Sequence, residues 1–266
     1  MQRAQTHYHQ CALCEHRCHA NRLAGQIGPC KAGPIPRLYQ HRLEYGDELE
    51  LVPSHLFYLS GCDLRCVFCI AELDAFDPSR GQELTHELFH RAVAWGRSQG
   101  ARNLQWIGGE PTIHLPALLE IMSQHPDLPP IIWKSDFHGT PEAFDLLDGI
   151  VHTYVADLKF GNDACASRLA GIPNYLAIVT RNLQLASRQT RLIVRHLLLP
   201  GHTDCCLRPI LDFMREHMPD TPFSLRDGYL PHWRASQYVE LTRSSTRGEI
   251  RAAKSLAQQA GLNLIQ

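Results

Sequence analysis

Residues 55–69, HLFYLSGCDLRCVFC, decide the fold of this chain. The apolar run His55–Ser60 ends at a Ser-Gly turn, which predicts a short buried strand. The thiols of Cys62, Cys66 and Cys69 follow within eight residues, so one loop can wrap them around a single metal centre. A [4Fe-4S] cube normally takes four thiolates, and three nearby cysteines leave one iron open to another ligand. We therefore expect the reactive centre in this loop.

Two simpler interpretations of the three cysteines are a zinc knuckle and a set of buried, inert thiols. A closed zinc site needs four protein ligands, and no fourth ligand is evident beside Cys62, Cys66 and Cys69. The spacing therefore favours a cluster over either alternative.

Beyond Pro53, short apolar runs alternate with amphipathic stretches, as is typical of βα units around a parallel sheet. The predicted strands are 55–60, 103–108, 130–135, 152–159, 190–198 and 223–227. Helices are expected at 88–96 and 115–122, and a C-terminal helix opens with the capping-box pair Thr246 and Glu249 and stops before Gly261. Six βα units are too few to close an eight-stranded barrel. We expect an α/β fold, a partial (β/α)6 TIM-like barrel over 54–266, after a small Cys-rich metal-binding extension over 1–53.

The composition limits the partners that the chain can have. Its 266 residues are 44% hydrophobic and 20% charged, with a formal charge of −1 and no block of Lys and Arg, so a nucleic-acid partner is not expected. The first ten residues lack an apolar signal region, and no apolar run approaches the roughly 20 residues of a membrane helix. We expect a cytoplasmic protein without a membrane partner. A reducing cytosol makes metal binding a better explanation of the ten cysteines than disulfides.

The remaining cysteines form one further group and a scattered remainder. The group is Cys11, Cys14, Cys18 and Cys30, whose four soft ligands predict a second metal site, either zinc or an auxiliary Fe–S cluster, with no metal as the third alternative. His16 and His19 are substitute ligands. Cys165, Cys205 and Cys206 are scattered, and we expect the adjacent pair to pack rather than to act in redox chemistry.

The C-x3-C-x2-C spacing at the end of the first strand resembles that of the radical S-adenosylmethionine (SAM) superfamily. By this resemblance Cys62, Cys66 and Cys69 ligate the cluster, and its open iron chelates the amino and carboxylate groups of SAM. Gly108-Gly109-Glu110-Pro111, at the end of the next predicted strand, looks like the superfamily's GGEP motif, which contacts the amino group. A GGE tripeptide alone is only a turn; after the cysteine loop it predicts cofactor contacts from Gly108, Gly109 and Glu110.

Two later strand ends resemble the branch related to pyruvate formate-lyase activating enzyme. Asp157-Leu158-Lys159 and residues 193–202, IVRHLLLPGH, match motifs whose charged residues lie near the nucleoside and carboxylate of SAM in that branch. The resemblance implies that Asp157, Lys159 and Arg195 bind the cofactor; the alternative is a plain ion pair. Ile70-Ala71 and Lys134-Ser135-Asp136 depart from the branch, so the substrate contacts of activating enzymes are not transferred.

The resemblance implies an oxidoreductase of the activating-enzyme type. An external one-electron donor of the flavodoxin or ferredoxin type would drive cleavage of SAM at the cluster to a 5′-deoxyadenosyl radical, which abstracts a hydrogen atom from a substrate. That substrate is a glycyl radical enzyme, another protein or a small molecule. Phe68, between two ligands, packs either on adenine or in the core. The alternative from another class is a non-catalytic Fe–S or zinc-binding protein, or an electron-transfer protein.

Overall fold

The chain folds around one open, curved sheet. The computed structural model describes residues 2–265. The strands lie in the order β3-β1-β2-β4-β5-β6-β7-β8-β9. Their bounds are β1 Arg37–Glu44, β2 Ser54–Leu59, β3 Gln82–Glu83, β4 Asn103–Gly108, β5 Ile131–Ser135, β6 Thr153–Asp157, β7 Arg191–Leu197, β8 Phe223–Arg226 and β9 Leu264–Ile265. Strands β2 and β4 to β9 run parallel, whereas β1 pairs antiparallel with β2 and β3.

All six predicted strands are present, and the open order confirms the α/β partial-barrel prediction. Strands β1, β3 and β9 were not predicted. Strand β1 is mostly half-exposed and therefore lacks an apolar pattern, while β3 and β9 contain two residues each.

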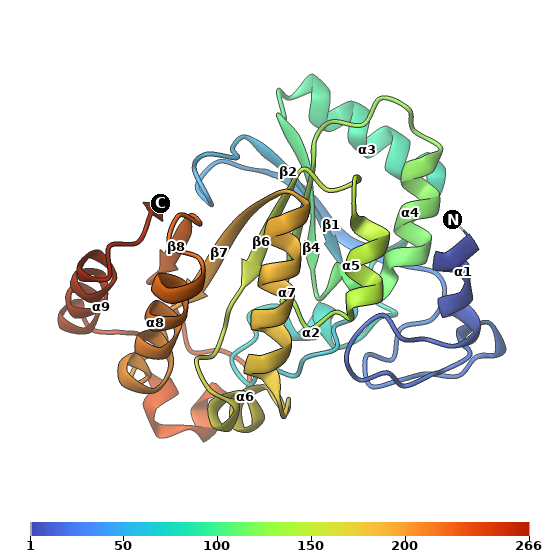
Figure 1. Ribbon diagram of the computed structural model, residues 1–266. Coiled ribbons are helices and arrows are strands. Elements are labelled where there is room, and N and C mark those ends of the chain that lie inside the picture. Colours follow the sequence, from blue (N-terminus) through green and yellow to red (C-terminus); the bar gives the residue numbers. More distant parts are fainter. Residues whose placement is uncertain (1, 266) are drawn as a thin grey trace.

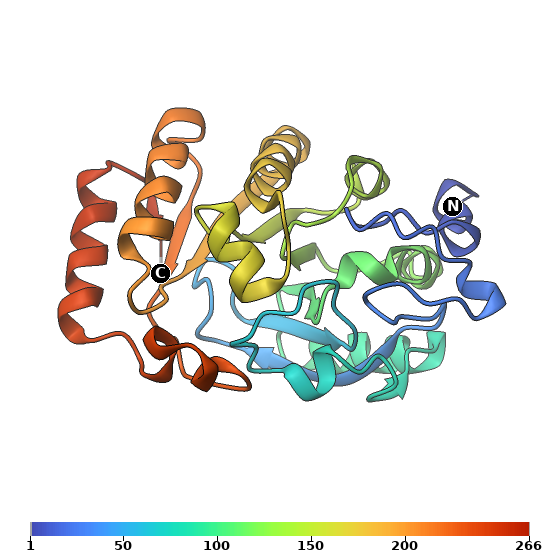
Figure 2. The same cartoon turned by 90° about the horizontal axis from the view of Figure 1, so that it is seen from below.

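Helices connect the parallel strands and cover the outer side of the sheet (Figures 1 and 2). Their bounds are α1 Gln2–His9, α2 Glu72–Ala75, α3 His86–Ser98, α4 Leu115–Ser123, α5 Pro141–Leu147, α6 Asp163–Ala170, α7 Tyr175–Gln189, α8 Arg208–His217 and α9 Arg247–Gln259. The predicted capping box of α9 is formed, since Thr246 accepts from the Glu249 amide and Glu249 accepts from the Thr246 amide. Within residues 2–265, no helix combines the length and apolar composition that crossing a membrane requires.

The two faces of each central strand have different roles because side chains alternate along a strand. On β5, β6 and β7 the outward residues Trp133, Ala156 and Val194 join the main core with the helices. The inward residues Ile132, Val155 and Ile193 form a small separate cluster with Leu51. Further along the same inward face come Lys134, Asp157 and Arg195. The barrel interior therefore changes from apolar to charged toward the carboxyl ends of the strands.

The connection between β1 and β2 enters the barrel from the amino ends of its strands and reaches the charged residues further along them. Leu51 is buried there against the small apolar cluster. The Glu48 side chain is 1% exposed, and its carboxylate lies 3.0 Å from Lys134 Nζ and 3.1 Å from Arg195 Nε. Asp47 also pairs with Lys134, and its Oδ1 lies 2.9 Å from Arg226 Nη2. We call this segment, residues 47–51, the barrel plug.

The N-terminal segment packs on the barrel and shares its core. Ala4, Cys11 and Leu13 are buried in the main core, and α1 lies beside α4 (Figure 1). We expected residues 1–53 to fold around a metal and not around an apolar core. Among the described residues, the apolar side chains of this segment are instead buried against the barrel. Strand β1, which also precedes Pro53, belongs to the sheet.

Candidate active site

A cavity of about 320 Å³ opens at the carboxyl ends of the parallel strands. Every residue that the sequence nominated for the cluster and for SAM lines it: Cys62, Cys66, Cys69, Gly108, Gly109, Glu110, Asp157, Lys159 and Arg195. These residues come from four strand ends that are far apart in the sequence. Parallel strands bring them together because their carboxyl ends meet at one edge of the sheet.

The Cys62–Cys69 loop is held in place by the end of helix α6. The Arg65 amide donates to the Ala170 carbonyl at 3.2 Å, and the Val67 amide donates to the Leu169 carbonyl at 2.8 Å. Cys62 and Cys66 are buried, and Cys69 is half-buried. Burial raises the pKa of all three thiols, that of Cys66 to about 12. The thiols are therefore protonated unless a cationic metal centre stabilises the thiolates.

The two glycines of the Gly108–Glu110 turn are required by backbone packing. A Cβ atom on Gly109 would overlap the carbonyl of Gly61, and one on Gly108 would overlap the Leu59 backbone. Gly108 also has φ of +128°, which disfavours other residues. The Gly109 amide donates to Leu59 at 2.7 Å and the Glu110 amide to Gly61 at 2.8 Å. The turn thus lies directly against the start of the cysteine loop.

Glu110 is a buried carboxylate with most of its acceptor capacity in use. Its Oε1 accepts from the Thr112 amide and the Ser135 hydroxyl, both at 2.9 Å, and its Oε2 accepts from the Asp136 amide at 2.9 Å. Burial, assisted by the charge of Asp63, raises the pKa of Glu110 to about 7. Because a carboxylate oxygen can accept two bonds, Oε2 retains capacity for a further donor.

Asp63 and Asp136 are two buried acids beside the cavity that were not predicted as site residues. Asp63 Oδ2 lies 2.7 Å from His138 Nδ1; although burial opposes ionisation, this contact holds the pKa of Asp63 below its ordinary value. Burial and the charges of Asp63 and Glu110 raise the pKa of Asp136 well above its ordinary value. Asp136 lines the cavity, and its Oδ2 has no hydrogen-bond partner within residues 2–265. The one signal for Asp136 in the sequence was its position, one residue after the predicted strand 130–135.

Asp157, Lys159 and Arg195 form one ion-pair network. An ion pair was the alternative to cofactor binding that the sequence left open for these residues. Asp157 lies 2.6 Å from Lys159 Nζ and 3.4 Å from Arg195 Nη1. Although burial opposes it, the charges of Lys159 and Arg195 hold the pKa of Asp157 well below its ordinary value. The barrel plug supplies the other partners of Arg195, Glu48 and Asp47. The cations are thereby fixed at the cavity wall.

Aromatic side chains close one side of the cavity. The Phe68 ring packs edge-on against Phe160 and Tyr229, with centroids 6.2 Å apart in each pair. The Tyr229 hydroxyl donates to the Leu241 carbonyl at 2.8 Å, and the Arg234 amide donates to Val67 at 3.0 Å. The segment after β8 is thereby attached to the cysteine loop. Phe68 both packs in this wall and borders the cavity.

The N-terminal cysteines are not gathered as ligands of a single ion. Arg22 Nη2 lies 3.2 Å from Cys11 Sγ and 3.8 Å from Cys30 Sγ. Within the described residues, no three ligand atoms lying within 4.8 Å of one another include a sulfur of Cys11, Cys14, Cys18 or Cys30. The sulfurs of Cys62, Cys66 and Cys69 do not share such a group either. A metal at the N-terminal cysteines stays a prediction.

Comparisons with known proteins agree with this geometry. Residues 56–214 match the Radical SAM superfamily. The chain is 33% identical over 276 aligned residues to Uncharacterized protein MJ0674 of Methanocaldococcus jannaschii, which covers 98% of this chain and 78% of that protein. A radical SAM methyltransferase from Sphaerobacter thermophilus superposes with a TM-score of 0.52 at 14% identity, over 98% of this chain and 86% of that one.

Streptococcus suis SuiB has the same fold at similarly low identity. Its structures with the precursor peptide SuiA and with S-adenosylmethionine give TM-scores of 0.54 and 0.56 at 14% and 15% identity, each over 76% of this chain. The chain spans less than half of those SuiB chains, 46% and 47%. Superfamily membership brings with it a [4Fe-4S] cluster, SAM and an external electron donor. The match over most of the barrel shows that this chain belongs to the radical SAM superfamily and is a radical SAM enzyme.

Proposed function

We propose that this enzyme abstracts a hydrogen atom from a protein or peptide substrate at the mouth of the cavity. One observation carries the assignment of the cofactors: all nine nominated residues line a single cavity. In the proposed assignment the cluster is held by Cys62, Cys66 and Cys69. When bound, the cluster and SAM supply one-electron reductive cleavage, which yields methionine and a 5′-deoxyadenosyl radical.

The residues around the cavity fit these cofactors. Three buried thiols provide the soft ligands that a cluster needs and leave one iron open. Beside Cys62 lie the buried acids Asp63 and Asp136, whose ligand oxygens come within 4.8 Å of its sulfur and of each other. The unpartnered Asp136 Oδ2 and the spare acceptor of Glu110 suit a ligand that carries a sulfonium and an amino group.

The protein's own contribution is to bind, orient and exclude water. We assign Glu110 to the amino group of SAM, because it is buried, fixed by three hydrogen bonds and retains one acceptor position. We assign Lys159 and Arg195 to its carboxylate and nucleoside side, where Asp157 holds both cations in place. Phe68 and Tyr229 form the apolar wall that keeps water from the reacting atoms.

The mouth of the cavity favours a large substrate. Ile70 and Leu230 line the cavity and are 76% and 64% exposed. Leu73 on α2, close in sequence to Ile70, is 69% exposed. Exposed apolar side chains at the rim of a site are typical of surfaces that contact another protein. SuiB, which shares the fold, has been solved with a precursor peptide, and this supports the same substrate class here.

The test is anaerobic reconstitution followed by reduction with dithionite in the presence of SAM. The wild type should produce 5′-deoxyadenosine, and Cys62→Ala should produce none. Ser79→Ala, an exposed change shortly after the same loop, is the matched control and should behave like the wild type. Equal product from wild type and Cys62→Ala would remove the proposal and leave the non-catalytic alternative.

A second measurement addresses the substrate. Candidate partner proteins, glycyl radical enzymes among them, are mixed with the reduced enzyme and SAM, and electron paramagnetic resonance records any new organic radical. A protein-centred radical supports the activating-enzyme type. A radical that forms only with small molecules would overturn the protein-substrate part of the proposal.

A further inference from the structure

Four metal-ligand side chains meet at a second point of the molecule. Cys165 Sγ, the sulfurs of Cys205 and Cys206, and one ring nitrogen of His202 all lie within 4.8 Å of one another. Cys165 is on α6, whereas the other three residues belong to the connection between β7 and α8. None of the four is among the described residues that line the active-site cavity. These cysteines are scattered in the sequence, and folding brings them together.

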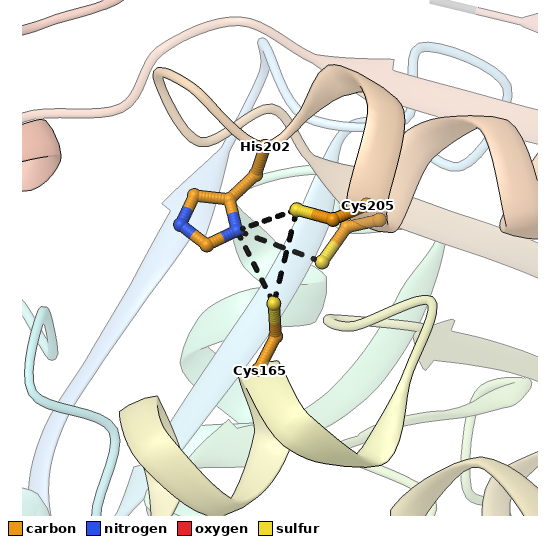
Figure 3. A group of neighbouring side chains, drawn as sticks. Cys165, His202 and Cys205 are labelled. Carbon is orange, nitrogen blue, oxygen red and sulfur yellow. Dashed lines mark hydrogen bonds between the residues drawn. The ribbon is translucent and has the colours of Figure 1, made fainter.

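The distances among these atoms are those of a tetrahedron around one ion. For Zn–S of about 2.3 Å and Zn–N of about 2.0–2.1 Å, tetrahedral angles place two sulfurs about 3.8 Å apart and a sulfur and a nitrogen about 3.6 Å apart. The Cys165 and Cys205 sulfurs are 3.8 Å apart. His202 Nδ1 lies 3.6, 3.3 and 3.7 Å from the sulfurs of Cys165, Cys205 and Cys206. Figure 3 shows the labelled His202 ring with one nitrogen toward the sulfurs of Cys165 and Cys205.

The surroundings of His202 also match those of a metal ligand. Its other ring nitrogen, Nε2, lies 3.5 Å from Glu240 Oε1 and 3.5 Å from Arg168 Nη2, and Arg168 and Glu240 pair at 2.5 Å. A carboxylate behind a ligating imidazole fixes the ring orientation and the tautomer, and it is a regular feature of metal sites. Cys165, His202 and Cys206 are buried, while Cys205 is exposed. The exposed sulfur gives an ion access to an otherwise enclosed site.

We propose that Cys165, His202, Cys205 and Cys206 bind a zinc ion in a closed, structural Cys3His site. Four protein ligands leave no open position, so the site would hold structure rather than perform chemistry. A cube would need its thiolates further apart than these sulfurs lie. The inference goes beyond the proposed function and does not depend on it.

The position of the site indicates what the zinc would stabilise. It would fasten α6 to the β7–α8 connection, and the last residues of α6, Leu169 and Ala170, accept the hydrogen bonds of the Cys62–Cys69 loop. The Cys165 amide is bound by Asn162, which lies in the same segment as Lys159. Zinc would therefore brace two elements of the active site from outside the cavity.

The experiment is metal analysis of anaerobically purified full-length protein by mass spectrometry, compared with Cys165→Ser and with Cys206→Ser. Each variant should hold about one zinc fewer per chain than the wild type. Met214→Ala, which removes a buried side chain from the adjacent helix α8 without touching a ligand, is the control for general loosening and should keep its zinc. Iron and sulfide are measured in parallel, so loss of the cluster is distinguished from loss of zinc.

A second variant keeps the inference testable if the serine variants fail to fold. Glu240→Gln leaves all four ligands in place and removes the charge behind His202, so zinc affinity should fall roughly 10–100-fold in a chelator competition. X-ray absorption of the wild-type zinc should include three sulfurs and one nitrogen in a tetrahedral shell. Equal zinc in the wild type and both serine variants would overturn the inference, as would iron in this site or a Cys165–Cys205 disulfide in the anaerobic protein.

Discussion

Gly109 packs so closely on Gly61 that no side chain could be placed between the two backbones. This contact joins the turn that carries Glu110 to the residue that precedes Cys62, with the Glu110 amide donating to the Gly61 carbonyl at 2.8 Å. The relative position of the two loops that surround the reaction centre is therefore set by backbone rather than by side chains.

Replacing Gly109 with alanine should separate these loops. Overpacking of this kind costs about 1–3 kcal/mol of unfolding free energy, and a displacement near 1 Å can lower catalysis roughly 100-fold. We expect both losses in Gly109→Ala, measured by urea unfolding and by 5′-deoxyadenosine formation. Gly248→Ala, in the open first turn of α9, is the control and should be neutral or slightly stabilising. An active Gly109→Ala enzyme would show that the contact is dispensable.

The affinity for SAM should depend on pH through Glu110. The pKa of this carboxyl is about 7 in the folded chain against 4.5 for an ordinary glutamate. If Glu110 accepts from the amino group, the ionised form binds better, so affinity should rise with pH through about 7 and level off above it. Calorimetric titration of wild type and Glu110→Gln checks this: the variant should bind more weakly, by roughly tenfold or more, and lose the pH dependence. Exposed Glu87→Gln is the control.

Ionisation of Glu110 should lower the free energy of unfolding, whereas it should raise the affinity for SAM. Its folded pKa lies above its unfolded value, so the unfolded chain ionises first as the pH rises. The contribution of Glu110 to the free energy of unfolding should therefore fall between about pH 4.5 and 7 and stay constant above. Urea titrations of wild type and Glu110→Gln measure this contribution as the difference between their free energies of unfolding. If that difference stays the same from about pH 4.5 to 7, the raised pKa of Glu110 is contradicted.

Asp157→Asn should destabilise the protein more than loss of a surface pair. It leaves Lys159 without its carboxylate partner, whereas Arg195 keeps Asp47 and Glu48. We expect a loss of about 3 kcal/mol, the lower end for a broken buried pair, because Asp157 is partly exposed and Arg195 stays paired. Asp212→Asn breaks the exposed pair with Arg215 and should cost about 0–1 kcal/mol. Urea unfolding of both variants gives the comparison, and equal losses would show that the network contributes nothing special.

Charges at the mouth should separate SAM cleavage from substrate use. Ile70→Asp and Leu230→Asp alter the exposed apolar rim and leave the thiols and Glu110 unchanged. Formation of 5′-deoxyadenosine without substrate should match the wild type, while radical transfer to a protein substrate should fall at least roughly tenfold, since burying an unpaired carboxylate at an interface is costly. Leu73→Asp tests how far the rim extends. Unchanged transfer in Ile70→Asp and Leu230→Asp would place the substrate elsewhere.

The central strands could be predicted because their apolar runs alternate with helical periodicity. The site could be predicted in part because Glu110, Asp157 and Arg195 stand in motifs that resemble those of the radical SAM superfamily. They meet in the structure because the carboxyl ends of parallel strands share one edge of the sheet. Asp63 and Asp136 escaped notice because the sequence does not show that acids from different loops are buried side by side.

Cys165 and His202 are separated by 37 positions, and nothing in the sequence indicates that α6 faces the turn after β7. The β1–β2 connection was also unexpected as a partner of Arg195. Its acids are ordinary surface residues until β1 adds antiparallel to the sheet and directs them inward. In both cases tertiary topology, rather than local pattern, creates the chemistry.

The barrel plug affects the route by which molecules can reach the active-site cavity. Leu51 packs on the apolar cluster inside the barrel, and Glu48 pairs with Lys134 and Arg195, two cations that line the cavity. Because these side chains fill the barrel below the cavity, we expect substrate and SAM to enter on the side bordered by Ile70 and Leu230. A substrate bound at this rim would then also limit the access of dioxygen to the cluster.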